Sequence, residues 1–402
     1  MIRQEKIADI IDSQWMDFLK DDTGFEREIL GNIPVTQSFT TIVTGIRRAG
    51  KSTLLLQILR QKYEKAIYLR FDDIRLSSFE TDDFTRLLNE IEKRSITVLF
   101  FDEIQLISGW ELFVNHLLRE HYMVFITGSN ASMLSAEMGT HLTGRHLSVE
   151  LFPFSYTEYI HFRGIENNVE AVEAYIRAGG IPEYVKTTIP SILNTLIDDI
   201  LWRDIAVRHG VRDLISLRQL TVFLLTNISN KVTASKLVGM FGIKSPSTFL
   251  EYFSYLRDAY LFDFIPIFSH SLKVQARNPK KVYTMDLGLY TENAMSTSEN
   301  SGRRLENLIF LHLRRQYPNI FYYQEKNECD FIVLEKNMVS KAVQVCSNVT
   351  DDNFSREYNG LKEAMKSFNL SHGQLITLNQ SDKFEDNGMT IELIPANVFL
   401  SE

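Results

Sequence analysis

One short segment constrains the fold of this chain more than any other feature. Residues 45–52 read Gly-Ile-Arg-Arg-Ala-Gly-Lys-Ser, which matches the pattern G-x-x-x-x-G-K-[ST]. Glycines let a backbone wrap an anion so that successive N–H groups point at it, and the following helix adds its positive N-terminal end. Lys51 would reach the outer phosphates and the Ser52 hydroxyl would hold Mg²⁺. The pattern predicts a phosphate-binding loop (P-loop) made of Gly45, Ile46, Arg47, Arg48, Ala49, Gly50, Lys51, Ser52 and Thr53.

The residues on both sides of this loop support that interpretation. Residues 38–44 are rich in β-branched side chains, which favours a strand, and residues 52–63 contain five Leu or Ile in a run too long for a strand. A strand, a glycine loop and a helix form the setting that the motif requires. The alternative, a plain strand-to-helix turn with a surface lysine, explains fewer of these features. Arg47 and Arg48 would act as helper cations or contact neighbouring elements.

An acidic pair supplies the second half of the expected site. Residues 98–103 read Val-Leu-Phe-Phe-Asp-Glu, a buried strand that ends in two carboxylates. Ligands of open α/β sheets bind at the carboxyl ends of the strands. We expect Asp102 to hold Mg²⁺ and Glu103 to polarise a hydrolytic water. A solvated acidic strand end is the alternative interpretation.

Two more features extend this nucleotide-binding half. A strand at 66–71 and a helix at 83–93 come between the loop and the acidic pair, an order that resembles the additional-strand class of P-loop ATPases. An apolar strand then ends in Thr-Gly-Ser-Asn at 127–130. In AAA-type ATPases a polar residue at this place senses the γ-phosphate, so Ser129 or Asn130 is a candidate. Ordinary turn chemistry explains the same residues equally well.

Arg145 is a candidate arginine finger. It stands in Leu-Thr-Gly-Arg, just before an expected strand at 146–151. Such an arginine stabilises charge on the transferring phosphoryl group and acts within one chain or across a subunit interface. A structural surface arginine is the alternative.

Composition excludes several classes of protein. The chain has 402 residues, 44% hydrophobic residues and two cysteines, Cys329 and Cys346, so we expect two or three globular domains without a disulfide framework or zinc pattern. No stretch reaches the length of a membrane span, and the charged N-terminus is not a signal peptide. We therefore expect a cytoplasmic protein that does not contact a membrane. The net charge of −8 argues against broad nucleic-acid binding.

One stretch departs from this acidic average. Residues 208–281 contain eleven Lys or Arg and four Asp or Glu. Helices at 216–227, 234–241 and 247–258, followed by strands at 265–268 and 281–284, resemble a winged helix-turn-helix. Its second helix offers only Ser245, Ser247, Thr248 and Arg257 to a DNA groove. DNA binding and a packing or protein-contact role both remain open. Residues 152–208 are mostly helical, with a turn at 179–183.

The C-terminal hundred residues form another α/β segment. A helix at 305–316, strands at 320–324, 331–335 and 341–345, a helix at 357–368, and strands at 374–377 and 389–394 resemble the restriction-endonuclease-like fold. Glu306 on the helix and Asp330 between the first two strands fit its metal-binding order. The last pair reads Gln344-Val345-Cys346, where a carboxylate and a lysine are needed. Two of four groups are lost, so an active nuclease is not expected.

Taken together, these motifs resemble a family of bacterial and archaeal AAA-type ATPases in which a P-loop core precedes a winged-helix segment and a nuclease-like domain of unknown function. The resemblance covers nearly the whole chain and implies ATP and Mg²⁺ as cofactors. It implies an α/β fold with a parallel-sheet P-loop core at 1–151, a helical lid at 152–208, a winged-helix segment at 209–285 and a restriction-endonuclease-like domain at 302–402. The motifs that carry it are 45–53, 101–105, 127–130, 142–145, 153–155, 179–183, 283–288, 302–307 and 329–331.

Three functions follow as hypotheses. The first is an Mg²⁺-dependent ATPase whose cycle moves the later domains, with DNA as a candidate partner. The second is a nucleotide-gated switch that sets affinity for a protein partner while hydrolysis acts as a timer. The third, an active nuclease, is the least favoured. An arginine finger acting in trans would require a homo-oligomer.

Overall fold

The computed structural model describes residues 1–128, 144–295 and 300–402, and it divides the chain into two compact units. The first unit consists of Met1–Phe152 and Asp258–Tyr260, and the second of Pro153–Arg257 and Leu261–Glu402. Ser129 and Asn130, the two candidates for a γ-phosphate sensor, lie outside the described residues.

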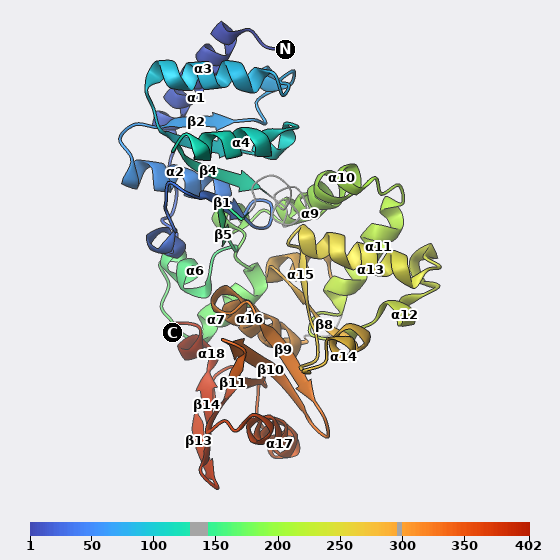
Figure 1. Cartoon of the computed structure of the whole chain (residues 1–402). Helices are drawn as coiled ribbons and strands as arrows, with labels where there is room; N and C mark the ends of the chain where they lie inside the picture. Colours follow the sequence, from blue (N-terminus) through green and yellow to red (C-terminus); the bar gives the residue numbers. More distant parts are fainter. Residues whose placement is uncertain (129–143, 296–299) are drawn as a thin grey trace. The chain divides into compact units, whose positions relative to one another are not determined.

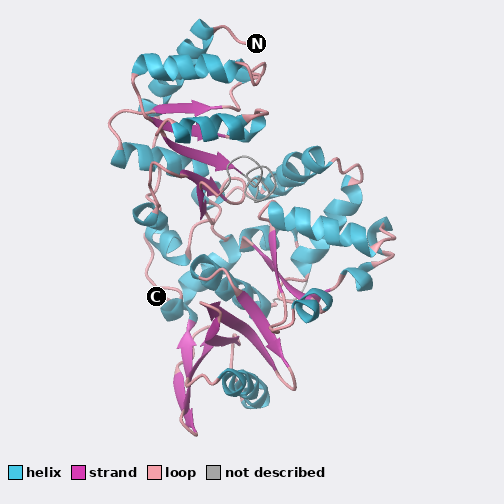
Figure 2. Ribbon diagram, in the orientation of Figure 1, coloured by secondary structure: helices cyan, strands magenta, loops and turns pink. Residues whose placement is uncertain are grey.

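The first unit is built on a five-stranded parallel sheet (Figures 1 and 2). Its strands are β1 (Thr40–Thr44), β2 (Ile67–Arg70), β3 (Val98–Asp102), β4 (Met123–Gly128) and β5 (His146–Glu150). Its longer helices are α1 (Gln4–Lys20), α2 (Lys51–Lys62), α3 (Asp83–Arg94) and α4 (Trp110–Arg119). Apolar side chains of α1, α3 and α4 form one core with alternate strand residues such as Ile42, Phe101 and Ile126. The α/β prediction is confirmed, and the predicted strands are present with ends that differ by a few residues.

The order of the strands in the sheet is β2-β3-β4-β1-β5. In the chain, β2 comes between the P-loop strand β1 and the acidic strand β3. In the sheet, β4 lies between them and β2 forms the edge. The residues that end β4 therefore lie between the P-loop and the acidic pair.

The second unit begins with helices. They are α6 (Tyr156–Arg163), α7 (Val169–Ala178), α8 (Pro182–Thr187) and α9 (Ser191–Asp199), followed by a π-helix (Ile200–Ala206) and α10 (Val207–His209). The helical character predicted for 152–208 is correct. Its role as a lid stays a prediction.

A small antiparallel sheet follows, with strand order β6-β8-β7. It comprises β6 (Lys231–Val232), β7 (Phe262–Ile265) and β8 (Lys280–Thr284), with helices α11 (Leu214–Thr226), α12 (Ala234–Leu237), α13 (Pro246–Asp258) and α14 (Leu272–Arg277).

Two predicted elements of this segment are wrong in detail. The expected strand at 265–268 is β7 at 262–265; it ends before Pro266, which has no N–H to donate to a ladder. The expected helix at 234–241 ends at Leu237, because Gly239 adopts a left-handed φ of 88°.

The C-terminal sheet has six strands in the order β13-β14-β12-β11-β10-β9, with mixed directions. They are β9 (Ile320–Gln324), β10 (Glu328–Glu335), β11 (Met338–Val345), β12 (His372–Thr377), β13 (Asp382–Asp386) and β14 (Met389–Pro395). The helices are α15 (Leu287–Asn293), α16 (Ser301–Gln316), α17 (Asp351–Phe368) and α18 (Ala396–Phe399). Asp330, predicted between strands, lies inside β10, and the sequence analysis missed β13.

A buried carboxylate joins three parts of the second unit. Asp286, which caps α15, accepts hydrogen bonds from the backbone N–H of Gly180 at 2.7 Å and of Gly288 at 2.8 Å. Burial raises the pKa of Asp286 to about 6. A Cβ atom on Gly180 would lie 2.3 Å from the Phe154 carbonyl oxygen, and one on Gly179 would lie 2.2 Å from Asp286 Oδ1. The glycine pair is thus required by close approach.

We predict that Gly180→Ala destabilises the second unit by about 1–3 kcal/mol, because the methyl group displaces backbone that cannot yield. Gly302→Ala is the matched control: Gly302 lies in α16, and its Cβ would meet only the Ser347 hydroxyl at 3.8 Å. Urea unfolding of both variants tests this. Equal stability of the two variants would contradict the close-approach argument.

Candidate functional site

The loop between β1 and α2 adopts a conformation that depends on its glycines. Gly45 has φ 137°, and a Cβ there would lie 2.1 Å from the Leu151 carbonyl oxygen. Gly50, the residue before α2, has φ 95°. Arg48 between them also has a positive φ, 64°, which costs a non-glycine residue free energy. These three positions give residues 45–50 the tightly curved backbone that a phosphate-binding loop requires.

Lys51 contacts this loop from the first position of α2. Its ammonium donates to the carbonyl oxygens of Gly45 at 2.9 Å and Ile46 at 3.0 Å, and the residue is only 7% exposed. Ser52, next along the helix, is exposed, and Thr53 is half-buried. The lysine is therefore held over the loop at the positive end of a helix, where an anion is favoured.

Arg27, which the sequence analysis missed, supports the loop. Its guanidinium donates to the carbonyl oxygens of Ala49 at 2.8 Å and Phe152 at 2.8 Å, and the residue is buried. No motif surrounds Arg27, so only the fold reveals this contact.

Asp102 ends β3 as a buried carboxylate held by two hydroxyl groups. Tyr68 donates to its Oδ2 at 3.0 Å, and Thr127 of β4 donates to its Oδ1. Burial and the negative charge of Asp102 raise the pKa of Tyr68 well above its ordinary value, so the phenol stays protonated. These two donors fix the orientation of the carboxylate.

Glu103 follows in a left-handed conformation with φ 57°. Its backbone N–H donates to Thr127 Oγ1 at 3.1 Å, and its carboxylate accepts a hydrogen bond from the Gln105 side-chain amide. Gln105 Oε1 is buried and has no hydrogen-bond partner among the described residues. The left-handed backbone conformation of Glu103 is strained, and strain of this kind costs about 1–3 kcal/mol and clusters at functional sites.

Thr127 therefore links both acidic residues, because its hydroxyl contacts the Asp102 carboxylate and the Glu103 N–H. The sequence analysis looked for a polar residue at the end of this strand but favoured Ser129 or Asn130. The signal was the threonine within an otherwise apolar strand.

Arg145 lies at the opposite end of the sheet from the P-loop. Its carbonyl accepts from the N–H of Thr40, the first residue of β1, whereas the loop follows Thr44. Four residues of strand span about 13 Å, which exceeds the reach of an arginine side chain. A finger role within one chain does not fit this placement, and a role across a subunit interface stays a prediction.

The residues present fit a phosphate chain with Mg²⁺. The glycine loop and Lys51 offer donors to an anion, while Ser52 and Asp102 offer oxygen atoms, the ligands that Mg²⁺ prefers. The β-strand ends that carry Thr44 and Asp102 lie on the same edge of the sheet, separated by β4.

Comparison with known proteins agrees with this geometry. Residues 37–160 match a family described as "AAA domain", and residues 169–300 match a domain of unknown function (DUF8612). The chain is 31% identical to the uncharacterized protein MJ1544 of Methanocaldococcus jannaschii over 390 residues, which cover 88% of this chain and 86% of that protein. The chain belongs to the MJ1544 family.

Two further proteins are similar to this chain. An uncharacterized protein of Haemophilus influenzae is 31% identical over 316 residues, 73% of this chain and 79% of that protein. The solved structure of a signal-transduction ATPase with numerous domains from Pyrococcus horikoshii aligns with 72% of the chain at a TM-score of 0.28 and 14% identity. The chain spans 44% of that protein. The match of residues 37–160 to the AAA domain family makes the first unit of this MJ1544-family chain an AAA-type P-loop domain.

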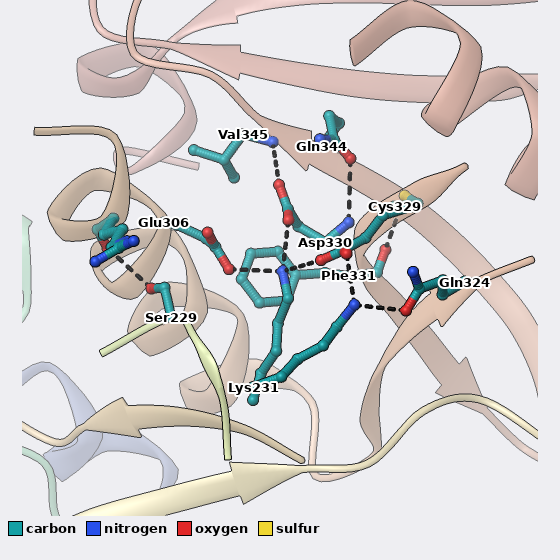
Figure 3. A network of polar contacts seen from close by, with 12 residues as sticks. Ser229, Lys231, Glu306, Gln324, Cys329, Asp330, Phe331, Gln344 and Val345 are labelled. Carbon is teal, nitrogen blue, oxygen red and sulfur yellow. Dashed lines mark hydrogen bonds and ion pairs between the residues drawn. The ribbon is translucent and has the colours of Figure 1, made fainter. Parts of the chain in front are cut away.

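A second cluster of charged side chains lies within the second unit, around Lys281 of β8. Figure 3 labels two of its carboxylates, Glu306 and Asp330. The Lys281 ammonium lies 2.7 Å from Asp330 Oδ1, 2.9 Å from Glu328 Oε1 and 3.0 Å from Glu306 Oε1. Its side chain is only 4% exposed. Three N–H groups thus meet three carboxylates, which satisfies the ammonium completely.

This cluster contains an ammonium that the sequence pattern did not supply. The sequence analysis found Cys346 at the place where the nuclease pattern needs a lysine. The structure supplies an ammonium from Lys281, which lies 49 residues before Asp330 in the chain. Gln344 Oε1 accepts from the Asp330 N–H at 3.1 Å, and its amide donates to Glu357 at 2.6 Å. Cys346 Sγ instead lies 3.2 Å from the Asn348 carbonyl oxygen.

Lys281 offsets the negative charge of the three carboxylates in the cluster. Burial, followed by the negative charge of Asp330, raises the pKa of Glu306 to about 7. Burial alone would lower the pKa of Lys281, but the carboxylates of Asp330, Glu306 and Glu328 outweigh it and hold that pKa well above its usual value. No group of three or more His, Cys, Asp or Glu side chains with metal-binding geometry occurs in the described part of the chain. Across the same residues, no helix is long and apolar enough to cross a membrane.

We predict that Lys281→Met lowers the free energy of unfolding by about 3–5 kcal/mol at neutral pH, because it leaves buried carboxylates without their cation. The loss should shrink as the pH falls from 8 to about 5, because Glu306, whose pKa is raised to about 7, then becomes protonated and neutral. Thermal unfolding of both proteins across this pH range measures the effect.

Lys383→Met is the control for this prediction, since Lys383 forms an exposed pair with Glu385 at 3.0 Å. Its loss should change stability by less than about 1 kcal/mol at any pH. A Lys281→Met protein as stable as the control at pH 8 would refute the account of a lysine-balanced cluster.

Proposed function

We propose that the first unit binds and hydrolyses ATP with Mg²⁺. The observation that carries this proposal is the shared Thr127 hydroxyl, which aligns Asp102 and Glu103 beside the strand that leads into the P-loop. An isolated loop would account only for phosphate binding. The preference for adenine rests on the similarity to AAA-type proteins.

Each residue has a defined role in this proposal. The loop N–H groups and Lys51 bind the phosphates, and Ser52 and Asp102 hold the metal ion. When bound, Mg²⁺ neutralises charge on the phosphates. Glu103 orients and polarises the attacking water. Arg145 acts from a neighbouring subunit, which makes a homo-oligomer part of the proposal, and Asn130 is retained as a candidate γ-phosphate sensor.

For the second unit we propose that residues 209–285 form a winged helix that contacts DNA. The order β6-β8-β7, with α11, α12 and α13 around it, supports this proposal, as does the excess of basic residues. In this view the ATP cycle changes the affinity for DNA. The alternative is a switch in which ATP controls binding of a protein partner and turnover is slow.

A metal-dependent nuclease is the least favoured function for the C-terminal sheet. Lys281 already neutralises Glu306 and Asp330, the two carboxylates that would hold the metal ion. We propose that this nuclease-like domain serves for contact and packing.

We predict that Lys51→Ala abolishes ATP binding and hydrolysis. Glu103→Gln should keep ATP binding and lower turnover at least about 100-fold, since it removes only the group that polarises water. Phosphate release and titration calorimetry with ATP measure turnover and affinity separately. Glu120→Gln, an exposed change of the same type in this unit, is the control and should behave as the parent protein. Unchanged turnover in both Lys51→Ala and Glu103→Gln would falsify the proposal.

We further predict that Thr127→Val lowers turnover roughly tenfold or more, because Asp102 and the Glu103 backbone lose a shared partner, whereas ATP affinity changes little. Thr127→Ser keeps the hydroxyl and should restore most of the rate. A purely structural threonine would show equal effects of the two substitutions, and the comparison of turnover rates decides between these roles.

A further inference from the structure

A pocket of about 330 Å³ lies in the second unit between α12, α13, α14 and the start of β8. These elements gather beside the small sheet in Figure 1. Its volume is at the lower end of the range for small-molecule sites, about 300–1,000 Å³. It therefore admits one compact group rather than a long chain.

Three cationic side chains converge on this pocket. Arg257 comes from α13, Arg277 ends α14, and Lys280 begins β8. Among the described residues, neither Arg277 nor Lys280 lies within ion-pairing distance of a carboxylate. Asp263, the acid whose charge acts on Lys280, is bonded to Arg314 Nε at 3.1 Å. In the part of the chain that the structure describes, the charges of Arg277 and Lys280 are therefore not paired with a carboxylate.

Lys280 is half-buried, and its pKa responds to the positive charge around it. Burial, followed by the positive charge of Arg257, lowers the pKa of Lys280. A bound anion would remove both penalties, because it replaces lost water contacts and offsets the repulsion between the two cations.

The remaining walls of the pocket are partly apolar. Phe253 and Phe264 pack against each other with ring centroids 4.9 Å apart, and both line the pocket. Thr233 also lines it, and its hydroxyl oxygen is buried without a hydrogen-bond partner among the residues described. The pocket combines cations, one unused hydroxyl and aromatic surface.

We propose that this pocket binds one nucleotide unit of a nucleic-acid strand. Arg257, Arg277 and Lys280 hold its phosphate, and the apolar walls receive its sugar and base. Arginine presents a planar set of donors that suits phosphate, and bases are held by aromatic surfaces in proteins that bind single strands. The inference rests on the proposed nucleic-acid contact of residues 209–285 and locates that contact in this pocket.

Charge reversal at Arg277 tests the assignment. We would measure fluorescence anisotropy of a labelled single-stranded oligonucleotide of about 12 nucleotides, and of its duplex, with the full chain in the absence of ATP. Arg277→Glu should weaken binding at least tenfold. Lys273→Glu is the matched control, because Lys273 is an exposed residue of the same helix outside the pocket and the charge change is identical.

A second, neutral substitution keeps the test independent of folding. Lys280→Gln should weaken binding several-fold and reduce the dependence of log affinity on log salt by about one unit. Circular dichroism and ATP turnover should match the parent protein for every variant.

The outcomes separate the two proposals. Oligonucleotide binding that is unchanged by Arg277→Glu, or weakened equally by Lys273→Glu, overturns the pocket assignment while the DNA contact stands. No binding by the parent protein overturns both. Tighter binding of a glutamate-rich peptide than of either oligonucleotide also overturns the assignment, because it identifies an acidic protein as the ligand.

Discussion

The second unit depends on strand β8, whose buried polar groups bond residues of α16 and β10. Lys281 bonds three carboxylates of α16 and β10, and Tyr283 donates to Glu306 Oε1 at 2.7 Å. The Asn307 side chain pairs with both the N–H and the carbonyl oxygen of Thr284 at 2.9 Å. Asp286, just beyond the strand, then holds the glycine pair at 179–180. Buried polar groups without partners are costly, so each anchor specifies one arrangement.

In the first unit, the fold brings residues of separate strands to one edge of the parallel sheet. Parallel strands place their carboxyl ends together, so Thr44, Asp102 and Thr127 end up near one another although 83 residues separate the first from the last. Because β4 lies between β1 and β3, the residue that contacts the Asp102 carboxylate from the side of the P-loop strand is Thr127, which offers a hydroxyl rather than a second charge. The strained Glu103 then leaves the sheet in a fixed direction.

Sequence reasoning succeeded where the chemistry is local. The P-loop, the acidic strand end and most strands of the two larger sheets follow from contiguous patterns. Lys281 and Arg27 could not be predicted, because each acts on residues far along the chain and neither belongs to a motif. The error at 265–268 arose because an apolar run was extended through Pro266, which cannot donate to a ladder. Strand β13 was missed because its sequence, Asp-Lys-Phe-Glu-Asp, is mostly charged and its residues are largely exposed at the sheet edge.

The packing around Gly45 has a mechanical consequence. The loop glycine lies directly against the Leu151 carbonyl group, and Arg27 bonds both Ala49 in the loop and Phe152, the residue at which the first unit ends. The loop and the exit of the chain are therefore clamped to a single guanidinium. A rearrangement of the loop backbone at Ala49 would therefore act through Arg27 on Phe152, the residue before the covalent junction with Pro153.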